Sequence, residues 1–201
     1  MSETGEEQKY VKEAFDTNWV VPLGPNVNGF EDDLKAFVSK NSDGSELSRE
    51  VVALSAGTAA VHLGLLASGV GPGDEVCVQS FTFCASSHPI TYLGATPVFI
   101  DSEPDSWNMD PELLEKAIID RKEKTGKYPK AIVPVALYGM PYNCDKIMAI
   151  SEKYGIPVVE DAAEGCGSRW KGQVLGTFGK FGVLSFNGNK MITTSGGGAL
   201  I

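Results

Sequence analysis

The chain has 201 residues, of which 42% are hydrophobic and 21% charged, and its 26 acidic and 17 basic side chains give a net charge of −9. This composition excludes a disordered chain and a collagen-like repeat, its apolar runs are too short to span a bilayer, and its acidic excess disfavours nucleic-acid binding. The polar, acidic start is neither a secretory signal nor a transit peptide, so we expect a cytoplasmic protein with one large domain.

Two helices are predicted before the first strand. Residues 6–15 form the first, and the second begins near Asn28, which can cap it together with Glu31 as in a capping box. A proline-containing loop joins them, and residues 1–48 are expected to be an N-terminal helical segment. Apolar side chains on one face of the second helix are Phe30, Leu34, Phe37 and Val38.

After Ser48, short β-branched runs alternate with segments of helical length. The runs are 51–54, 75–78, 96–100, 131–137, 157–159, 181–185 and 199–201, and the helical segments are 58–67, 85–93, 111–122 and 145–154. Such alternation is typical of βαβ units. We therefore predict an α/β fold over residues 49–201, with a mostly parallel seven-stranded sheet, helices on both faces and a hairpin at 169–176 that turns at Lys171-Gly172.

In α/β sheets, ligands bind at the carboxyl ends of strands, so functional residues are expected there. The first strand is followed by Gly57 and Thr58 at the start of a helix. Free N–H groups, a hydroxyl and the positive end of the helix dipole suit a phosphate, although Thr58 could simply cap the helix. Phe81 and Phe83 follow the second strand and could stack on a flat ring or pack in the core.

Two further strand ends carry charge. Glu160 and Asp161 end the fifth strand, where a carboxylate in the crevice would keep a heterocyclic nitrogen protonated, unless the pair forms a solvated turn. Lys190 follows the sixth strand among small and polar residues. A lysine desolvated in a pocket is a nucleophile for Schiff-base chemistry, whereas most lysines lie on the surface.

The combination of these four strand ends indicates pyridoxal phosphate bound as an imine of Lys190. Asp161 would hold the pyridinium nitrogen, while the helix start at Gly57 and the hydroxyl of Ser185 would hold the phosphate. The sequence therefore predicts a phosphate site built from N–H groups and hydroxyls in an acidic protein. No cysteine or histidine spacing suits a metal, and the four cysteines are expected to be free thiols.

Five segments make this interpretation specific: SAGTAAVHLGL (55–65), QSFTFCAS (79–86), GATPVFID (94–101), VVEDAAEGCGS (158–168) and GVLSFNGNKMITTSGGG (182–198). They resemble the DegT/DnrJ/EryC1 sugar aminotransferases, and the similarity covers essentially the whole chain. The resemblance implies a type I pyridoxal-phosphate fold, a homodimer, and transfer of an amino group, normally from glutamate, to a keto-sugar nucleotide.

The resemblance also implies residue roles. Lys190 corresponds to the Schiff-base lysine, which would also move the proton as general base and acid, and Asp161 to the partner of the pyridine nitrogen. Phe83 corresponds to the ring-stacking aromatic residue. The remaining cofactor-binding positions are Gly57, Thr58, Ala59, Glu164, Ser185 and Asn187.

The substrate branch is suggested by three features of the sequence. Glu164 follows Asp-Ala-Ala, Asn187 replaces a common histidine, and WVVPLGP occupies residues 19–25. This set resembles the branch that aminates C4 of a UDP-linked 4-keto-6-deoxy-N-acetylhexosamine for bacillosamine-type glycans and exopolysaccharide. Ala136 departs from relatives that have a polar residue there, and a related 3-keto-sugar aminotransferase is the alternative.

Other functions fit the sequence less well. A dehydratase branch of the family has histidine in place of Lys190. A nicotinamide-binding protein would have G-x-G-x-x-G in the first strand-helix turn, where this chain has Ser55-Ala56-Gly57-Thr58. Relatives are longer and have a smaller carboxyl-terminal domain, which we expect to be absent from this chain. A catalytically incompetent, cofactor-binding remnant is therefore the remaining alternative.

Overall fold

Helices and strands alternate through the chain in the computed structural model, which describes residues 4–201. The helices are α1 (Glu6–Asp16), α2 (Pro25–Val38), α3 (Gly57–Ala67), α4 (His88–Tyr92), α5 (Pro111–Thr125) and α6 (Cys144–Tyr154), with 3-10 turns η1 (Cys84–Ser86) and η2 (Leu137–Gly139). The strands are β1 (Val52–Leu54), β2 (Glu75–Gln79), β3 (Thr96–Ile100), β4 (Ala131–Val133), β5 (Val159–Asp161), β6 (Arg169–Trp170), β7 (Gln173–Val174), β8 (Phe181–Ser185) and β9 (Gly198–Leu200).

Seven strands form one mostly parallel sheet, as predicted. Strands β1-β9-β8-β5 pair in that order, as do β3-β2-β4, and parallel bridges Ile132↔Val158 and Val135↔Asp161 connect β4 to β5. Only β9 runs antiparallel to its neighbours, β1 and β8. The carboxyl ends of the other six strands therefore lie at one edge.

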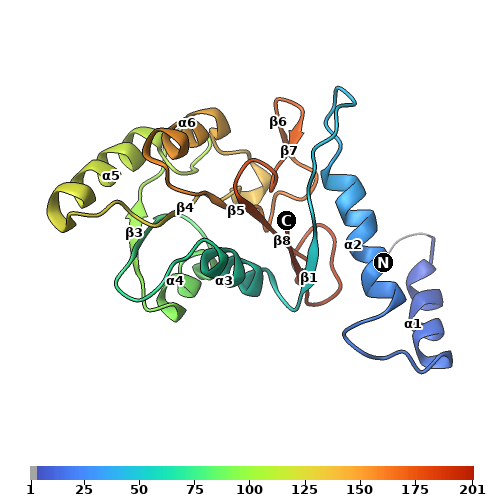
Figure 1. Ribbon diagram of the computed structural model, residues 1–201. Coiled ribbons are helices and arrows are strands. Elements are labelled where there is room, and N and C mark those ends of the chain that lie inside the picture. Colours follow the sequence, from blue (N-terminus) through green and yellow to red (C-terminus); the bar gives the residue numbers. More distant parts are fainter. Residues whose placement is uncertain (1–3) are drawn as a thin grey trace.

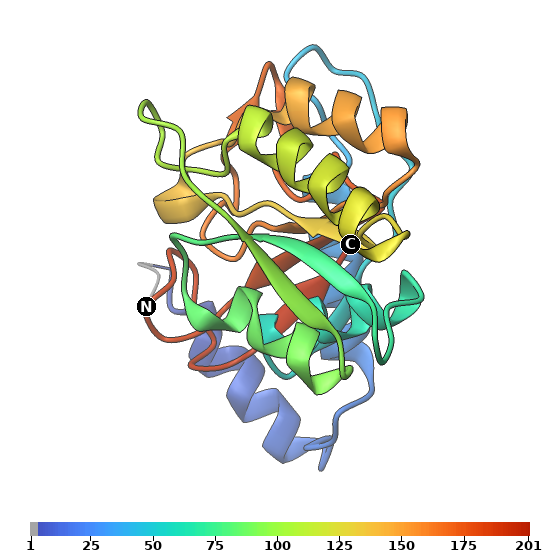
Figure 2. The same ribbon diagram turned by 90° about the vertical axis from the view of Figure 1, so that its left-hand side faces the viewer.

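Helices cover both faces of this sheet, as Figures 1 and 2 show. Because side chains alternate along a strand, Val76 and Val78 of β2 belong to the core that includes residues of α3 and α4, whereas Cys77 belongs to the core that includes residues of α5 and α6. The other central strands alternate in the same way, which gives one apolar core on each face. In contrast, α1 has no buried residue.

Prolines explain where predicted and observed elements differ. The run 131–137 pairs as a strand only to Val133, because Pro134 has no N–H to donate to the ladder. The predicted helix at 85–93 is divided into η1 and the short α4, where Pro89 occupies the first turn. The predicted hairpin is confirmed, with Lys171 and Gly172 both at positive φ in a two-residue turn.

The predicted capping box at the second helix is wrong. Gly24 is the N-cap of α2 and Pro25 occupies its first turn, so Asn28 lies inside the helix. Glu31 does not reach back to a helical N–H group. Its Oε1 instead accepts a hydrogen bond of 2.8 Å from the backbone N–H of Ala53, which fastens α2 to the edge strand β1.

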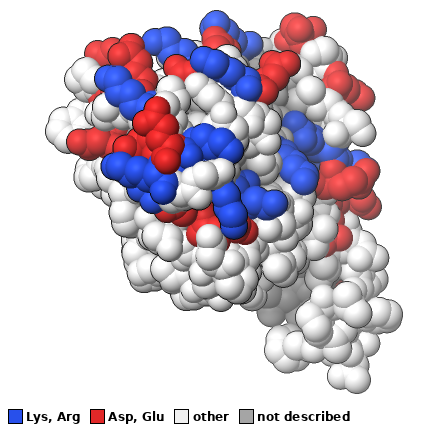
Figure 3. Space-filling view, turned by 60° about the vertical axis from the view of Figure 1, so that its left-hand side comes forward, with Lys and Arg blue, Asp and Glu red and all other residues white. Residues whose placement is uncertain are grey.

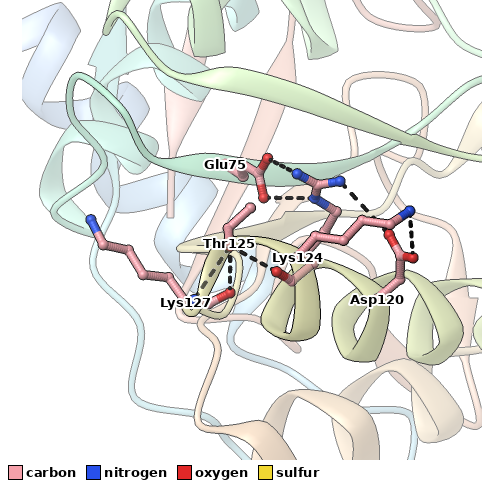
Figure 4. Close-up of polar contacts among 6 residues, drawn as sticks. Glu75, Asp120, Lys124, Thr125 and Lys127 are labelled. Carbon is pink, nitrogen blue, oxygen red and sulfur yellow. Dashed lines mark hydrogen bonds and ion pairs between the residues drawn. The ribbon is translucent and has the colours of Figure 1, made fainter.

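Helix α5 is attached to the sheet by a two-pronged ion pair. Arg121 donates from Nε and Nη2 to the carboxylate of Glu75, at 3.0 and 2.8 Å, where β2 begins (Figure 4). Lys124 pairs with Asp120 on the same helix at 2.8 Å. Gly126, at φ 76°, then ends α5 in the left-handed conformation. Among residues 4–201, no helix is both long and apolar enough to cross a membrane.

Substitutions near the starts of α5 and α2 test whether α2 begins at Pro25 and not at Asn28. Asp110 Oδ1 accepts from the N–H groups of Glu112 and Leu113 at 2.7 and 3.2 Å, so Asp110→Ala should lower the free energy of unfolding by about 1 kcal/mol. Asn28→Ala should cause no loss, because alanine is favoured inside a helix. Urea denaturation of both variants measures this. Equal losses would contradict the assigned boundary of α2.

Candidate functional site

A cavity of about 610 Å³ opens at the carboxyl edge of the sheet. Its walls come from the start of α3 and from the segments that follow β2, β4, β5 and β8. Every predicted site residue except Ala59 lines it: Gly57, Thr58, Phe83, Asp161, Glu164, Ser185, Asn187 and Lys190.

One end of the cavity is the N-terminus of α3. The N-cap is Ala56, which provides no side-chain hydrogen bond, so the alternative that Thr58 caps this helix is wrong. The first N–H groups of α3 have no acceptor within the helix. A Cβ on Gly57 would lie 2.9 Å from Ser185 Cβ, so only glycine allows β8 to come this close. The Ser185 hydroxyl therefore lies beside N–H donors that have no acceptor within the helix, an arrangement that suits an anion.

A buried carboxylate lies deeper in the cavity. Asp161, the last residue of β5, is 4% exposed, and its Oδ2 accepts a hydrogen bond of 2.6 Å from Ser86 Oγ. Its Oδ1 accepts from the N–H of Ala163 at 3.2 Å. The neighbouring Glu160 does not line the cavity, and its Oε1 accepts from the N–H of Phe178. Strand alternation thus directs Asp161 alone into the crevice, which excludes the alternative of a solvated acidic turn.

Burial raises the pKa of Asp161 above its usual value. Hydrogen bonds from Ser86 and Ala163 and the charge of Lys190 oppose this rise, whereas the charge of Glu164 adds to it. The contacts within the protein therefore do not fully offset the cost of burying the Asp161 carboxylate. A cationic ring nitrogen beside it would supply the missing positive charge.

Lys190 is a pocket lysine, and the alternative of a surface lysine is wrong. Its side chain is 13% exposed, and Nζ lies 3.1 Å from Glu164 Oε1. The second carboxylate oxygen of Glu164 accepts a hydrogen bond of 2.6 Å from the backbone N–H of Tyr138. Glu164 therefore connects the lysine to the turn that follows β4.

Aromatic side chains surround the cavity mouth. Phe83 lines the cavity and is 71% exposed, so it does not pack in the core and its ring is available for stacking. Phe81 also lines the cavity, and its ring pairs with that of Trp107 at a centroid distance of 5.8 Å. Tyr138, which is 82% exposed, contributes a third aromatic residue.

Sequence reasoning missed two residues of this site. Ser86, the hydrogen-bond donor to Asp161, ends the segment QSFTFCAS but was not singled out from it. Tyr138 holds Glu164 through its backbone N–H, at a φ of 53° that is unusual for a residue other than glycine. Every residue except proline has a backbone N–H, so the residue type of Tyr138 does not indicate this contact. The only signal of a turn there is the Tyr-Gly pair at 138–139.

Comparisons with known proteins converge on one family. The profile of the DegT/DnrJ/EryC1/StrS aminotransferase family matches residues 1–201. The Bacillus subtilis (strain 168) protein EpsN, named as a pyridoxal phosphate-dependent aminotransferase, is 50% identical over 98% of this chain and 49% of its own length. A GDP-perosamine synthase of Caulobacter vibrioides is 40% identical over 98% of this chain and 49% of its own.

A third relative bears on the chemistry of the sugar. The UDP-2-acetamido-2-deoxy-3-oxo-D-glucuronate aminotransferase of Pseudomonas aeruginosa is 40% identical over 89% of this chain and 46% of its own. The chain thus spans about half the length of the curated relatives that it matches.

Solved structures agree with the sequence comparisons. An aminotransferase of the same family from Brucella abortus matches 100% of this chain and 54% of its own, at 34% identity and a TM-score of 0.85. A sugar aminotransferase from Streptococcus pneumoniae, solved in its PLP form, matches 94% of this chain and 49% of its own, at 32% identity and a TM-score of 0.79.

The buried carboxylate predicts a pH-dependent stability difference. Because the pKa of Asp161 is raised in the fold, the native state holds more protons than the unfolded state above the ordinary carboxyl value of 3.8. The free energy of unfolding therefore falls as the pH rises through this range. Without cofactor, Asp161→Asn should have a melting temperature a few degrees above the unsubstituted chain at neutral pH, and this gain should vanish at acid pH.

A matched variant controls for the loss of negative charge. Asp101→Asn removes an exposed aspartate just after β3, so its melting temperature should show no pH-dependent gain. Thermal melts from acid to neutral pH compare the two variants. A gain of the same size for Asp101→Asn would show that net charge, and not burial, is responsible.

Proposed function

The chain belongs to the DegT/DnrJ/EryC1/StrS aminotransferase family, and on that premise we propose that it is the cofactor-binding part of a pyridoxal phosphate-dependent sugar aminotransferase. One observation carries the proposal: a pocket lysine, a buried aspartate and an open helix N-terminus face the same cavity. Each of these groups comes from a different strand end. They meet only because the sheet is parallel at that edge.

The residues present fit pyridoxal phosphate. The uncapped N-terminus of α3 with Ser185 suits the phosphate, and the buried Asp161 suits a protonated pyridine nitrogen. Phe83 offers a ring for stacking, and Lys190 offers an amine that is shielded from solvent. We propose that these residues hold the cofactor, together with Gly57, Thr58, Ala59, Glu164 and Asn187.

When bound, pyridoxal phosphate supplies an aldehyde carbon that reacts with amines and a ring that accepts electrons. The protein supplies the proton transfers. When it is not bound to the cofactor, Nζ of Lys190 would be the base that removes a proton from the donor carbon and the acid that delivers it to the cofactor carbon. Glu164 Oε1, 3.1 Å from Nζ, stabilises the ammonium form that exists between these two transfers.

For the substrate, we propose glutamate as the amino donor and C4 of a UDP-linked 4-keto-6-deoxy sugar as the acceptor. Support comes from the sequence branch that Glu164 and Asn187 indicate, and both residues line the cavity. The relatives include a GDP-perosamine synthase and a UDP-linked 3-oxo-sugar aminotransferase, so a GDP-linked sugar and a 3-keto-sugar are the competing acceptors. The product would serve polysaccharide biosynthesis.

The domain and assembly proposals follow from the family. We propose that residues 1–48, of which the structure describes 4–48, are an N-terminal helical segment and that residues 49–201 form the large, cofactor-binding domain. We also propose a cytoplasmic homodimer. No Asp, Glu, Lys or Arg occurs in residues 51–73 or 76–100. In Figure 3, the charged side chains gather over α5 and α6, whereas the surface over α4 shows few. Exposed Leu66, Tyr92 and Phe99 make this surface suitable for a second copy.

The attachment of the cofactor is tested with two lysine variants. Incubation with pyridoxal phosphate followed by borohydride should label Lys190, as read by peptide mass spectrometry. Lys190→Ala should abolish the visible absorbance and the label, because no other described residue that lines the cavity has an amine. Lys180→Ala, at an exposed position just before β8, should change neither. Absorbance that survives in Lys190→Ala would refute the assigned role.

The two half-reactions test the donor and the acceptor. Glutamate should remove the absorbance of the lysine-bound cofactor, and a UDP-linked 4-keto-6-deoxy sugar should restore it faster than its GDP-linked or 3-keto counterparts. Stopped-flow spectroscopy compares the three sugars. Cofactor labelling without any response to glutamate would support the alternative of an inactive remnant.

A further inference from the structure

Two buried amides lie beneath the cavity without lining it. Gln79 is the last residue of β2, and Asn108 lies in the segment between β3 and α5. Both are 0% exposed. A buried amide is stable only where its donors and acceptors find partners, so the partners of this pair show what it holds in place.

Gln79 connects three segments. Its Oε1 accepts from the backbone N–H groups of Met109 and Val135, at 2.8 and 3.3 Å. Its Nε2 donates to the carbonyl oxygen of Phe81 at 2.9 Å and to Asn108 Oδ1 at 3.2 Å. The loops that follow β2, β3 and β4 are therefore tied to one side chain.

Asn108 binds both ends of the turn Leu137–Met140, which follows β4. Its Oδ1 also accepts from the N–H of Leu137 at 3.2 Å, and its Nδ2 donates to the carbonyl oxygen of Met140 at 2.9 Å. These two backbone groups flank Tyr138. The amide orientation is fixed by these partners, because a flipped Asn108 would place its NH₂ group against the N–H of Leu137.

The turn that Asn108 holds leads directly to the lysine. The N–H of Tyr138 donates to Glu164 Oε2 at 2.6 Å, and Glu164 Oε1 pairs with Lys190 Nζ at 3.1 Å. Tyr138 is at φ 53°, a conformation that such a residue keeps only when its surroundings enforce it. Hydrogen bonds to the residues before and after the turn provide that enforcement.

We propose that Asn108 is a positioning residue for the catalytic site: its buried amide fixes the Leu137–Met140 turn, which orients Glu164 and through it Lys190. Gln79 holds Asn108 in place through the hydrogen bond from its Nε2 to Asn108 Oδ1. This inference rests on the proposed function for its catalytic consequence, but the geometry of the turn is independent of any cofactor. Asn108 does not touch the cavity, so it acts only through other residues.

Hydrogen exchange of the Tyr138 amide tests the positioning role in the cofactor-free chain. Asn108→Ala should increase the exchange rate of this amide about tenfold relative to the amides of β8. The isosteric Asn108→Asp keeps the acceptor for Leu137 but places a carboxylate oxygen, in place of the donor, against the carbonyl oxygen of Met140, so it should also increase the exchange rate. This second variant serves also if Asn108→Ala does not fold.

Thr177→Ala is the matched control for general destabilisation. Thr177 is 1% exposed and its hydroxyl donates to the carbonyl oxygen of Val174, but it does not contact the turn or the cavity. Exchange at Tyr138 should stay unchanged in this variant. An unchanged rate in both Asn108 variants, or an equal rise in Thr177→Ala, would overturn the positioning role.

A double-mutant cycle tests the connection to Lys190. The readout is the rate at which pyridoxal phosphate and borohydride label Lys190. By itself, Asn108→Ala should change the labelling rate several-fold, and it should have no further effect when Glu164→Gln is present, because both changes break the same connection. Additive effects would overturn the inference.

The outcomes distinguish the two proposals. Absence of labelling at Lys190 in the unsubstituted chain would refute the proposed function, while exchange at Tyr138 would still decide the role of Asn108. Normal labelling together with unchanged exchange in the Asn108 variants would refute the positioning role alone.

Discussion

The pairing of β5 with strands on both of its sides is the constraint on which the site depends. Asp161 ends β5, opposite Val183 of β8 on one side and bridged to Val135 beyond β4 on the other. This central position removes its carboxylate from solvent and surrounds it with the segments that carry Lys190 and Tyr138. An edge strand would leave the same aspartate hydrated, and its affinity for a cationic ring would be weaker.

The site resolves a conflict between an acidic protein and an anionic ligand. With a net charge of −9, long-range electrostatics do not attract a phosphate. The start of α3 supplies N–H donors and a dipole locally, and Ser185 adds a hydroxyl. Lys190 remains paired with Glu164 instead of serving as a phosphate anchor. Because backbone N–H groups and a hydroxyl are available to bind the anion, the amine of Lys190 is left for covalent chemistry.

Buried amides and glycines set the precision of this arrangement. A Cβ on Gly198 would lie 2.4 Å from the backbone nitrogen of Gly57, so β9 can approach the start of α3 this closely only because residue 198 is glycine. Gln79 and Asn108 fasten the loops after β2, β3 and β4 to one another. Loops at a cavity mouth are ordinarily the most mobile part of an α/β protein, and these contacts restrict them without occupying the cavity.

By itself, the sequence determined the parallel sheet, most strands and the residues at strand ends, because periodicity and turn residues act over a few neighbours. It also identified Lys190, Asp161 and Phe83 as candidates, since their residue types are unusual in those contexts. It could not exclude a solvated turn at Glu160 and Asp161, place Asn28 within α2, or find Tyr138 and Asn108. Those outcomes depend on strand pairing, on Gly24 as the cap and on hydrogen bonds between segments far apart in the chain. Only the tertiary structure brings such groups within reach of one another.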